Sequence, residues 1–362
     1  MQCQPYRPLG SSTFTGGEHE MVRGSLSDSF GQLGWTASDD ATFVGSHPGA
    51  VLARVIIAYG NRAEVAFSGG LVNEDTHLAT GLNFTPVAGD WVAVRSGQIV
   101  AVSDRRTAIT RPDPDGTRTQ VLAANVDTVL IVVAIDHLPS LRAIERLQVM
   151  AWDSGAIPLL VLTKADAHED PEEMLEFVAP VAVGIETFLT STRDGLGLDA
   201  LRDRISVGTT TMLGASGAGK TSLLNAMEGT HAATADVGGD GQGRHTTTTR
   251  RLYPMQNGGV MLDVPGIRSL SLHATDAGMA ETFTEIAQAS KRCRFRDCSH
   301  DGDAGCAIAA AVISGEISAR RLESWRAVQR ELSHHDRRHD PAAMAEQQKQ
   351  WKQMTKASRK RR

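Results

Sequence analysis

A glycine-rich segment ending in Lys-Thr has the spacing of a phosphate-binding loop. Residues 214–221 read Gly-Ala-Ser-Gly-Ala-Gly-Lys-Thr, after a β-prone segment at 209–213 and before a helix-like run at 222–227. Glycines let such a loop curl until its backbone N–H groups point at phosphate oxygens, and the following helix N-terminus favours negative charge. The lysine would contact the β- and γ-phosphates, and Thr221 would ligate Mg²⁺. The predicted nucleotide-binding residues are Gly214, Ala215, Ser216, Gly217, Ala218, Gly219, Lys220, Thr221 and Ser222.

Two segments further along the chain have the residue types of a magnesium and γ-phosphate site. Asp263-Val-Pro-Gly266 follows an apolar strand at 259–262, so the carboxylate could hold the Mg²⁺ shell and the Gly266 N–H could reach the γ-phosphate. A glycine-rich stretch contains the run 243–249, Gly-Arg-His-Thr-Thr-Thr-Thr. Thr246 or Thr247 is placed to reach Mg²⁺ when GTP is bound, and we predict that this stretch is a switch ordered by the γ-phosphate.

A third group predicts which base is bound. Thr163-Lys-Ala-Asp166 ends an apolar strand and resembles the Asn-Lys-x-Asp box of GTPases, with threonine in place of asparagine. The Asp166 carboxylate would accept from the guanine N1–H and exocyclic amine, a donor pair that adenine lacks, while the Lys164 stem stacks on the base. Ser191 and Thr192 begin a segment similar to the Ser-Ala base-contact loop, with threonine in place of alanine.

The order of these motifs along the chain is rotated. A standard GTPase has the phosphate loop first, followed by the switch threonine, Asp-x-x-Gly, the base box and the Ser-Ala loop. Here the base box at 163 and the Ser-Ala loop at 191 precede the phosphate loop at 214. A permutation moves the chain ends and keeps the three-dimensional site, so we predict a circularly permuted GTPase domain.

A cysteine cluster near the C-terminus has the composition of a metal site. Three of the four cysteines lie within fourteen residues of each other, with a histidine among them, in the pattern C-x4-C-x-H-x5-C. Three thiolates and one imidazole suit a closed, tetrahedral and structural Zn²⁺ site. The predicted ligands are Cys293, Cys298, His300 and Cys306.

The elements that must position these residues fall into distinct regions. Short β-type runs separated by turn signals, without helices, predict a small β-barrel at 45–112, of the OB or SH3-like type. Apolar strands at 126–135 and 157–162, with a helical stretch at 140–154 between them, predict a β-α-β unit in a mostly parallel sheet with helices on both faces. The fold class is therefore multidomain α/β, with the permuted GTPase domain at 113–275.

The remaining regions are distinguished by composition. Residues 1–44 are predicted to be a disordered extension, and residues 276–335 a helical zinc-binding domain with an apolar stripe that packs internally. Residues 336–362 form a basic tail, helical or disordered, that is either a solvated end or an arm for phosphates. No apolar run of eighteen residues and no secretory signal is present, so we expect a cytoplasmic protein without a membrane span.

These motifs together give the chain a family resemblance. Over about residues 45–332 it resembles the circularly permuted ribosome small-subunit-dependent GTPase A (RsgA) family. The matching pieces are Gly89-Asp90, Asn125-Val-Asp127, the phosphate loop, residues 243–248, residues 263–266 and the cysteine cluster. The resemblance implies an OB-fold domain, GTP and GDP as ligands, hydrolysis stimulated by the small ribosomal subunit, contacts to rRNA and a role late in subunit maturation. A monomer is expected.

The residue after Asp-x-x-Gly is Ile267, where small GTPases carry a glutamine that orients the attacking water. An aliphatic side chain cannot orient water, so we predict slow intrinsic hydrolysis. His245, beside the switch threonines, is the candidate catalytic residue, and the resemblance implies the same. Two other functions stay open at this point: a nucleotide-gated RNA-binding scaffold with negligible turnover, and an ATP-using P-loop enzyme.

Overall fold

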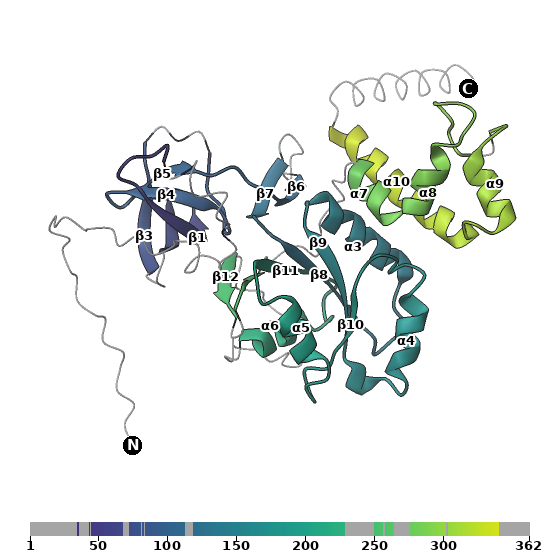
Figure 1. Cartoon of the computed structure of the whole chain (residues 1–362), viewed down its shortest axis with the longest axis horizontal. Helices are drawn as coiled ribbons and strands as arrows, with labels where there is room; N and C mark the ends of the chain where they lie inside the picture. The colour runs from purple at the N-terminus through teal and green to yellow at the C-terminus, as the bar shows by residue number, and fades with distance from the viewer. Residues whose placement is uncertain are drawn as a thin grey trace, which may run out of the picture.

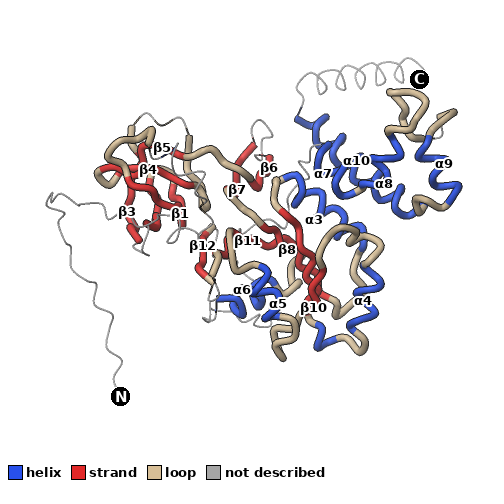
Figure 2. The backbone as a smooth tube through the Cα atoms, in the orientation of Figure 1, coloured by secondary structure: helices blue, strands red, loops and turns tan. Residues whose placement is uncertain are grey.

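The chain folds into three parts that follow one another along its length (Figure 1). The computed structural model describes residues 35, 43, 45–67, 72–80, 82, 84–112, 119–228, 250–255, 258–263, 276–301 and 303–339. A β-barrel comes first, an α/β sheet lies in the middle, and a helical part comes last. Strands dominate the first part and helices the last (Figure 2).

The first part is a closed five-stranded barrel with the strand order β1-β2-β3-β5-β4. Its strands are β1 (Val51–Tyr59), β2 (Arg62–Phe67), β3 (Val72–Leu78), β4 (Trp91–Arg95) and β5 (Gln98–Val102). Small and β-branched side chains fill its interior, including Val55, Val65, Val92 and Ile99. This confirms the predicted OB-type barrel. The polar sequence of β3, Val-Asn-Glu-Asp-Thr-His-Leu, had given no strand signal.

The middle part is built on a six-stranded sheet with the order β10-β9-β8-β11-β13-β12. The strands are β8 (Thr128–Ala134), β9 (Ile157–Thr163), β10 (Thr187–Leu189), β11 (Thr209–Leu213), β12 (Arg251–Pro254) and β13 (Val260–Asp263). Only β12, at the edge, is antiparallel to its neighbour among the described pairings. The mostly parallel sheet predicted from the apolar runs is confirmed.

Helices cover both faces of this sheet because its central strands are apolar on both sides. On one face, Ile131 of β8 and Leu160 of β9 pack against α3 (Leu141–Asp153) and α4 (Pro171–Val178). On the other, Leu130 and Leu159 pack against α5 (Leu198–Arg204) and α6 (Lys220–Glu228). Helix α3 begins where its sequence predicts, with the Ser140 hydroxyl accepting from the Ala143 N–H.

A separate two-stranded hairpin joins the barrel to the sheet. It consists of β6 (Ala108–Pro112) and β7 (Thr119–Ala124), which are antiparallel. Strand β6 falls within the range predicted for the barrel, yet it pairs with β7 outside the barrel. Tertiary pairing decides this assignment, since the sequence of β6 resembles that of the barrel strands.

A fully buried arginine in β1 connects the barrel to the six-stranded sheet. Arg54 donates to the Gly89 carbonyl at 3.0 Å, to the Asn125 carbonyl at 3.2 Å and to the Thr209 hydroxyl at 2.8 Å. Its guanidinium also lies over the Trp91 ring, 4.6 Å from the centroid. Burial lowers the pKa of Arg54 to about 9, well above neutral pH, so the group is a cation in the fold.

The backbone around Arg54 is tightly packed as well. A side-chain Cβ at Gly89 would lie 2.1 Å from the Ala124 carbonyl oxygen, so only glycine allows this approach. The Asp127 carboxylate accepts from the Thr209 N–H at 2.7 Å, which fixes the start of β11. The two segments that carried the resemblance, Gly89-Asp90 and Asn125-Val-Asp127, therefore form the barrel–sheet junction.

The helical part consists of α7 (Asp276–Thr282), α8 (Thr284–Ser290), α9 (Ala307–Ser314) and α10 (Ala319–His339). Its core contains the predicted stripe of Ile317, Leu322 and Val328, which confirms that the stripe packs internally. Helix α10 runs past residue 335, where the sequence had placed the end of this part. None of the helices in the described part of the chain is long and apolar enough to cross a membrane.

A buried carboxylate on α3 attaches the helical part to the sheet. Glu145 accepts from Arg320, Arg321 and the Ser324 hydroxyl, all on α10. A Cβ at Gly278 of α7 would lie 2.5 Å from the Val149 carbonyl oxygen, so α7 and α3 are in backbone contact. Paired cations satisfy the buried carboxylate, and the two parts therefore dock in one fixed arrangement.

Replacing Arg54 by leucine should destabilise the protein by about 3 kcal/mol, because three buried acceptors lose a charged donor. Chemical denaturation of the purified variant measures this change. Arg95→Leu is the matched control, since Arg95 is an exposed arginine on the same barrel and its loss should change stability by less than about 0.5 kcal/mol. Equal effects of the two substitutions would contradict this role for Arg54.

Candidate functional site

The predicted nucleotide-binding residues gather at one edge of the sheet. Strands β8, β9, β10, β11 and β13 are parallel, so their carboxyl ends lie on the same side. The base box follows β9, the Ser-Ala-type loop follows β10, the phosphate loop follows β11, and Asp263 ends β13. Segments far apart in sequence are thus brought to one crevice, which is where open α/β sheets bind ligands.

The phosphate loop has the strand-loop-helix context that its chemistry needs. It leaves β11 at Gly214, where a Cβ would lie 2.3 Å from the Val132 carbonyl oxygen. Gly217 and Gly219 have φ angles of 76° and 89°, in the region that favours glycine. Residues 215–217 are exposed, as are Thr221 and Ser222 in the first turn of α6, so their backbone N–H groups and hydroxyls are accessible to a ligand.

The Lys220 ammonium is held at the loop. It donates to the Gly214 carbonyl at 2.7 Å and to the Ala215 carbonyl at 2.6 Å. Asp263 lies close enough to interact with this charge. Burial raises the pKa of Asp263, and the positive charge of Lys220 partly opposes the rise. Asp263 ends β13, which is paired with the strand that leads into the phosphate loop, so a carboxylate and an ammonium lie at the same sheet edge, as a site for a phosphate with a divalent cation requires.

Thr163 ties the base box to the phosphate loop. Its side chain is buried, and the hydroxyl donates to the Ala218 carbonyl at 2.6 Å. A Cβ on Gly219 would lie 3.3 Å from the same hydroxyl oxygen. In the Asn-Lys-x-Asp box of GTPases, the asparagine makes this connection. The threonine hydroxyl makes the equivalent link between the two loops.

Asp166 is oriented by the loop that follows β10. It lies in a short 3-10 helix, η1 (Ala165–Ala167), and accepts from the Ser191 hydroxyl at 2.7 Å. The Ala165 N–H donates to the Thr190 carbonyl, which joins the two loops through their backbones. Asp166 keeps part of its side chain exposed, and the exposed Arg193 guanidinium stands 3.8 Å from its second oxygen. Thr192 is exposed in the same turn.

Lys164 has an acidic partner that the sequence reading missed. Its ammonium lies 2.6 Å from a carboxylate oxygen of Asp136, the residue that follows Ile135 beyond β8. This hydrogen bond lowers the pKa of Asp136 below the usual range of aspartate. Lys164 itself has a left-handed backbone, with φ at 62°. The signal in the sequence was a lone acidic residue directly after the apolar run 129–135.

Four predicted site residues lie outside the described residues: the candidate catalytic His245, the switch threonines Thr246 and Thr247, and Gly266. Strand β12 begins at Arg251, just after the threonine run, and β13 ends at Asp263, three residues before Gly266. Both strands belong to the sheet that carries the phosphate loop.

The three predicted cysteines and the histidine come together in the helical part. One donor atom from each of Cys293, Cys298, His300 and Cys306 lies within 4.8 Å of all the others. The His300 Nδ1 atom is 3.6 Å from the Cys293 sulfur and 3.8 Å from the Cys306 sulfur. Bond lengths of about 2.0–2.3 Å around a tetrahedral ion give ligand separations of about 3.5–3.8 Å, so the spacing fits a bound metal ion.

The surroundings of this cluster also suit a metal. The Ala307 N–H points at the Cys293 sulfur and the Ala309 N–H at the Cys306 sulfur, and such donors stabilise thiolates. Burial lowers the pKa of His300, which favours the neutral imidazole that a metal needs.

Removing the Thr163 hydroxyl should weaken nucleotide binding. We expect Thr163→Val to raise the dissociation constants of GDP and GTP about fivefold, because about 1 kcal/mol of hydrogen bonding between the two loops is lost. Titration of a fluorescent guanine nucleotide measures this. Thr163→Ser, which keeps the hydroxyl, is the control and should bind like the original chain. Equal affinity of the valine variant would contradict the assigned link.

Comparison with known proteins agrees with this geometry. A sequence model described as RsgA GTPase matches residues 102–273. The "Small ribosomal subunit biogenesis GTPase RsgA" of Streptomyces coelicolor is 40% identical over 88% of this chain and 91% of that protein. "Small ribosomal subunit biogenesis GTPase RsgA 2" of Listeria monocytogenes is 37% identical over 76% of this chain and 80% of that protein.

Solved structures give the same result for the fold. YjeQ from Thermotoga maritima superposes with a TM-score of 0.61 at 27% identity, over 78% of this chain and 98% of that one. YloQ, titled a circularly permuted GTPase, gives a TM-score of 0.60 at 22% identity, over 80% of this chain and 96% of that one. The permuted order of motifs, the barrel, the metal cluster and these relatives lead to one conclusion: the chain belongs to the RsgA GTPase family.

Proposed function

We propose that this GTPase hydrolyses GTP to GDP and phosphate during late maturation of the small ribosomal subunit, and that the subunit stimulates its turnover through contacts with rRNA. The observation that carries the proposal is the meeting of Asp166 and the phosphate loop at one sheet edge, linked by the Thr163 hydroxyl. The names of the relatives, which specify biogenesis of the small subunit, support the role.

Guanine selection would come from Asp166. The Ser191 hydroxyl occupies one carboxylate oxygen and holds the group in place, so the carboxylate is ready to accept from the guanine N1–H and amine. Adenine has no such donor pair and would leave a partly buried carboxylate unpaired, which is costly. This reasoning favours a GTPase over an ATP-using enzyme.

The triphosphate would be bound by the backbone N–H groups of the loop, with Lys220 released from its two carbonyls to contact the β- and γ-phosphates. Mg²⁺, when bound, neutralises charge that develops on the phosphates. Thr221, Asp263 and one of Thr246 and Thr247 are its proposed ligands, and Gly266 the proposed γ-phosphate donor.

The cysteine cluster would hold one structural Zn²⁺. Three thiolates and an imidazole leave no open coordination position, so His300 acts as a ligand and takes no part in hydrolysis. With the ion bound, the four ligands would fix the loop between α8 and α9 against α10, where Arg326 donates to the His300 carbonyl at 2.6 Å. We further propose that the protein acts as a monomer in the cytoplasm.

Turnover of GTP, measured with and without purified small ribosomal subunits, tests the function. We expect slow hydrolysis by the chain alone and strong stimulation by subunits, because Ile267 cannot orient water. His245→Ala should remove most of the stimulation and leave nucleotide affinity intact. Absence of any stimulated turnover in the original chain would favour the nucleotide-gated RNA scaffold, and full stimulation of the variant would exclude His245 from catalysis.

The metal assignment predicts one zinc ion per chain by elemental analysis. Cys306→Ser should lower the zinc content and the melting temperature, because the cluster loses the one ligand that is buried in the core of the helical part. Cys3→Ser is the matched control, since Cys3 lies outside the C-x4-C-x-H-x5-C pattern. A chain that folds fully and contains no zinc would contradict the assignment.

A further inference from the structure

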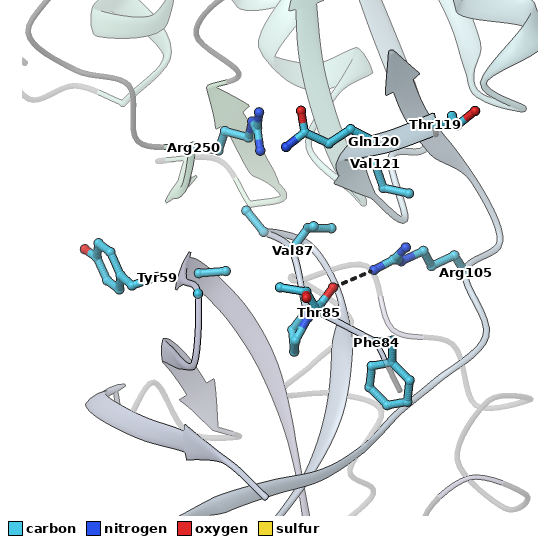
Figure 3. A pocket seen from close by; sticks show the side chains of 13 residues that line it. Tyr59, Phe84, Thr85, Val87, Arg105, Thr119, Gln120, Val121 and Arg250 are labelled. Atoms are coloured by element: carbon cyan, nitrogen blue, oxygen red, sulfur yellow. Dashed lines mark hydrogen bonds between the residues drawn. The ribbon is translucent and has the colours of Figure 1, made fainter. Parts of the chain in front are cut away.

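The base box, residues 163–166, lies apart from the cavity at the junction of the barrel and the hairpin. That cavity has a volume of about 670 Å³, and Tyr59, Arg105 and Arg250 are among the residues that line it (Figure 3). None of the described residues that line it belongs to the loops after β8, β9 or β10. The base box lies instead at the open sheet edge, where the Lys164 side chain is 37% exposed. A lysine exposed to this extent keeps its rotamer freedom unless a partner holds it.

The register of two central strands places Asp136 next to Lys164. Strands β8 and β9 are parallel, and their pairing extends to Ala134 and Thr163. The Ile135 N–H then donates to the Thr163 carbonyl at 3.0 Å, which extends the ladder by one residue. Asp136 and Lys164 are the next residues beyond this last bond on their strands. Backbone pairing therefore fixes the position of the carboxylate beside the lysine.

Asp136 holds the end of the Lys164 side chain. One of its carboxylate oxygens lies 2.6 Å from the Lys164 ammonium, and the other lies 2.7 Å from the Nδ1 atom of His137. The hydrogen bond from Lys164, more than the one from His137, lowers the pKa of Asp136, so the group is a carboxylate at neutral pH. Because both oxygens have partners, the carboxylate is oriented and the ammonium is held in one place.

This ion pair directs Lys164 along the path of a bound nucleotide. In the sheet, β8 lies between β9, which leads to Asp166, and β11, which leads to the phosphate loop. A nucleotide with its base at Asp166 and its phosphates in the loop must therefore cross the end of β8, where Asp136 lies. An ammonium held there extends the lysine stem from β9 toward the phosphate loop. The CH₂ groups of the stem then form an apolar surface beside the base.

We propose that Asp136 is a positioning residue for the nucleotide: its ion pair with Lys164 orders the lysine stem, in advance of binding, as the surface on which the guanine base stacks. A free lysine side chain would lose its rotamer entropy when the nucleotide binds, and an ion pair made beforehand removes part of that cost. The inference deepens the proposed function, since it rests on the base site assigned there to Asp166. It also explains an acidic side chain near an anionic ligand, because Lys164 neutralises its charge.

Titration of a fluorescent GDP into the full chain tests the proposal. Asp136→Ala should raise the dissociation constant about fivefold, the upper end of what an exposed ion pair contributes, and Asp136→Glu, which keeps the charge, should restore most of the affinity. Glu186→Ala is the matched control. Glu186 forms a 2.7 Å ion pair with Arg204, is also partly exposed, and precedes β10 at the opposite sheet edge. This control should bind GDP like the original chain, and unchanged or tighter binding by Asp136→Ala would contradict the proposal.

A double-mutant cycle separates positioning of Lys164 from a general structural effect. In a Lys164→Met background, which has no ammonium, Asp136→Ala should cause no further loss of affinity, because the two residues act as one unit. The difference between the original chain and Asp136→Ala should also shrink to about twofold in 1 M salt, because salt screens exposed ion pairs. A loss of the same size in the Lys164→Met background, or at low and high salt, would overturn the proposal.

Turnover and a second variant show which claim fails if one does. In GTP turnover stimulated by small ribosomal subunits, Asp136→Ala should raise KM and leave kcat unchanged, because the ion pair acts on binding. A lower kcat with unchanged KM would contradict a positioning role in binding. Asp166→Ala is titrated with GDP in parallel. Weak binding by Asp166→Ala together with full affinity of Asp136→Ala would overturn this inference alone, whereas full affinity of Asp166→Ala would overturn the proposed base site.

Discussion

The parallel pairing of β9, β8 and β11 is the constraint on which the site depends. It places the end of β9 beside the start of the phosphate loop, so that the Thr163 hydroxyl reaches the Ala218 carbonyl. The nucleotide pocket needs both loops at one edge, whichever is encoded first. A parallel sheet meets this need because the carboxyl ends of its strands lie at the same edge, whatever the order of the strands in the sequence. The rotated motif order is therefore compatible with an unchanged site.

Buried ionic contacts connect the two flanking parts to this sheet. Arg54 joins the barrel to Thr209, at the start of the strand that leads into the phosphate loop. Glu145 joins α10 to α3, which packs on the β8–β9 face. Each contact pairs a buried charged side chain with groups on the neighbouring part, so the contacts specify how the parts dock. Strand β12 adds a third connection, through Arg251 and Glu64, beside the predicted switch.

Local patterns in the sequence predicted the central strands, helix α3, the phosphate loop and the metal cluster, because each has a strong short-range signal. The range 45–112 predicted for the barrel included β6, which instead pairs with β7, and β3 was missed, because pairing across space decided both. Arg54 is recognisable in the sequence as a charged residue inside an apolar strand. Its partners Asn125 and Thr209 lie far along the chain, and no spacing rule connects them. Lys164 and Asp136 are also far apart in the sequence, and no spacing rule connects them. The hydrogen bond from the Thr163 hydroxyl to the Ala218 carbonyl also joins residues far apart in the chain, so no local pattern could predict it.

The central claim is that Asp166 reads the base of a triphosphate held by the loop around Lys220. Calorimetric titration of the purified chain with GTP and with ATP, each with Mg²⁺, tests it most directly. The account predicts that GTP binds at least about a hundredfold more tightly, since the partly buried carboxylate finds its two donors only in guanine. Equal affinities for the two nucleotides would contradict it.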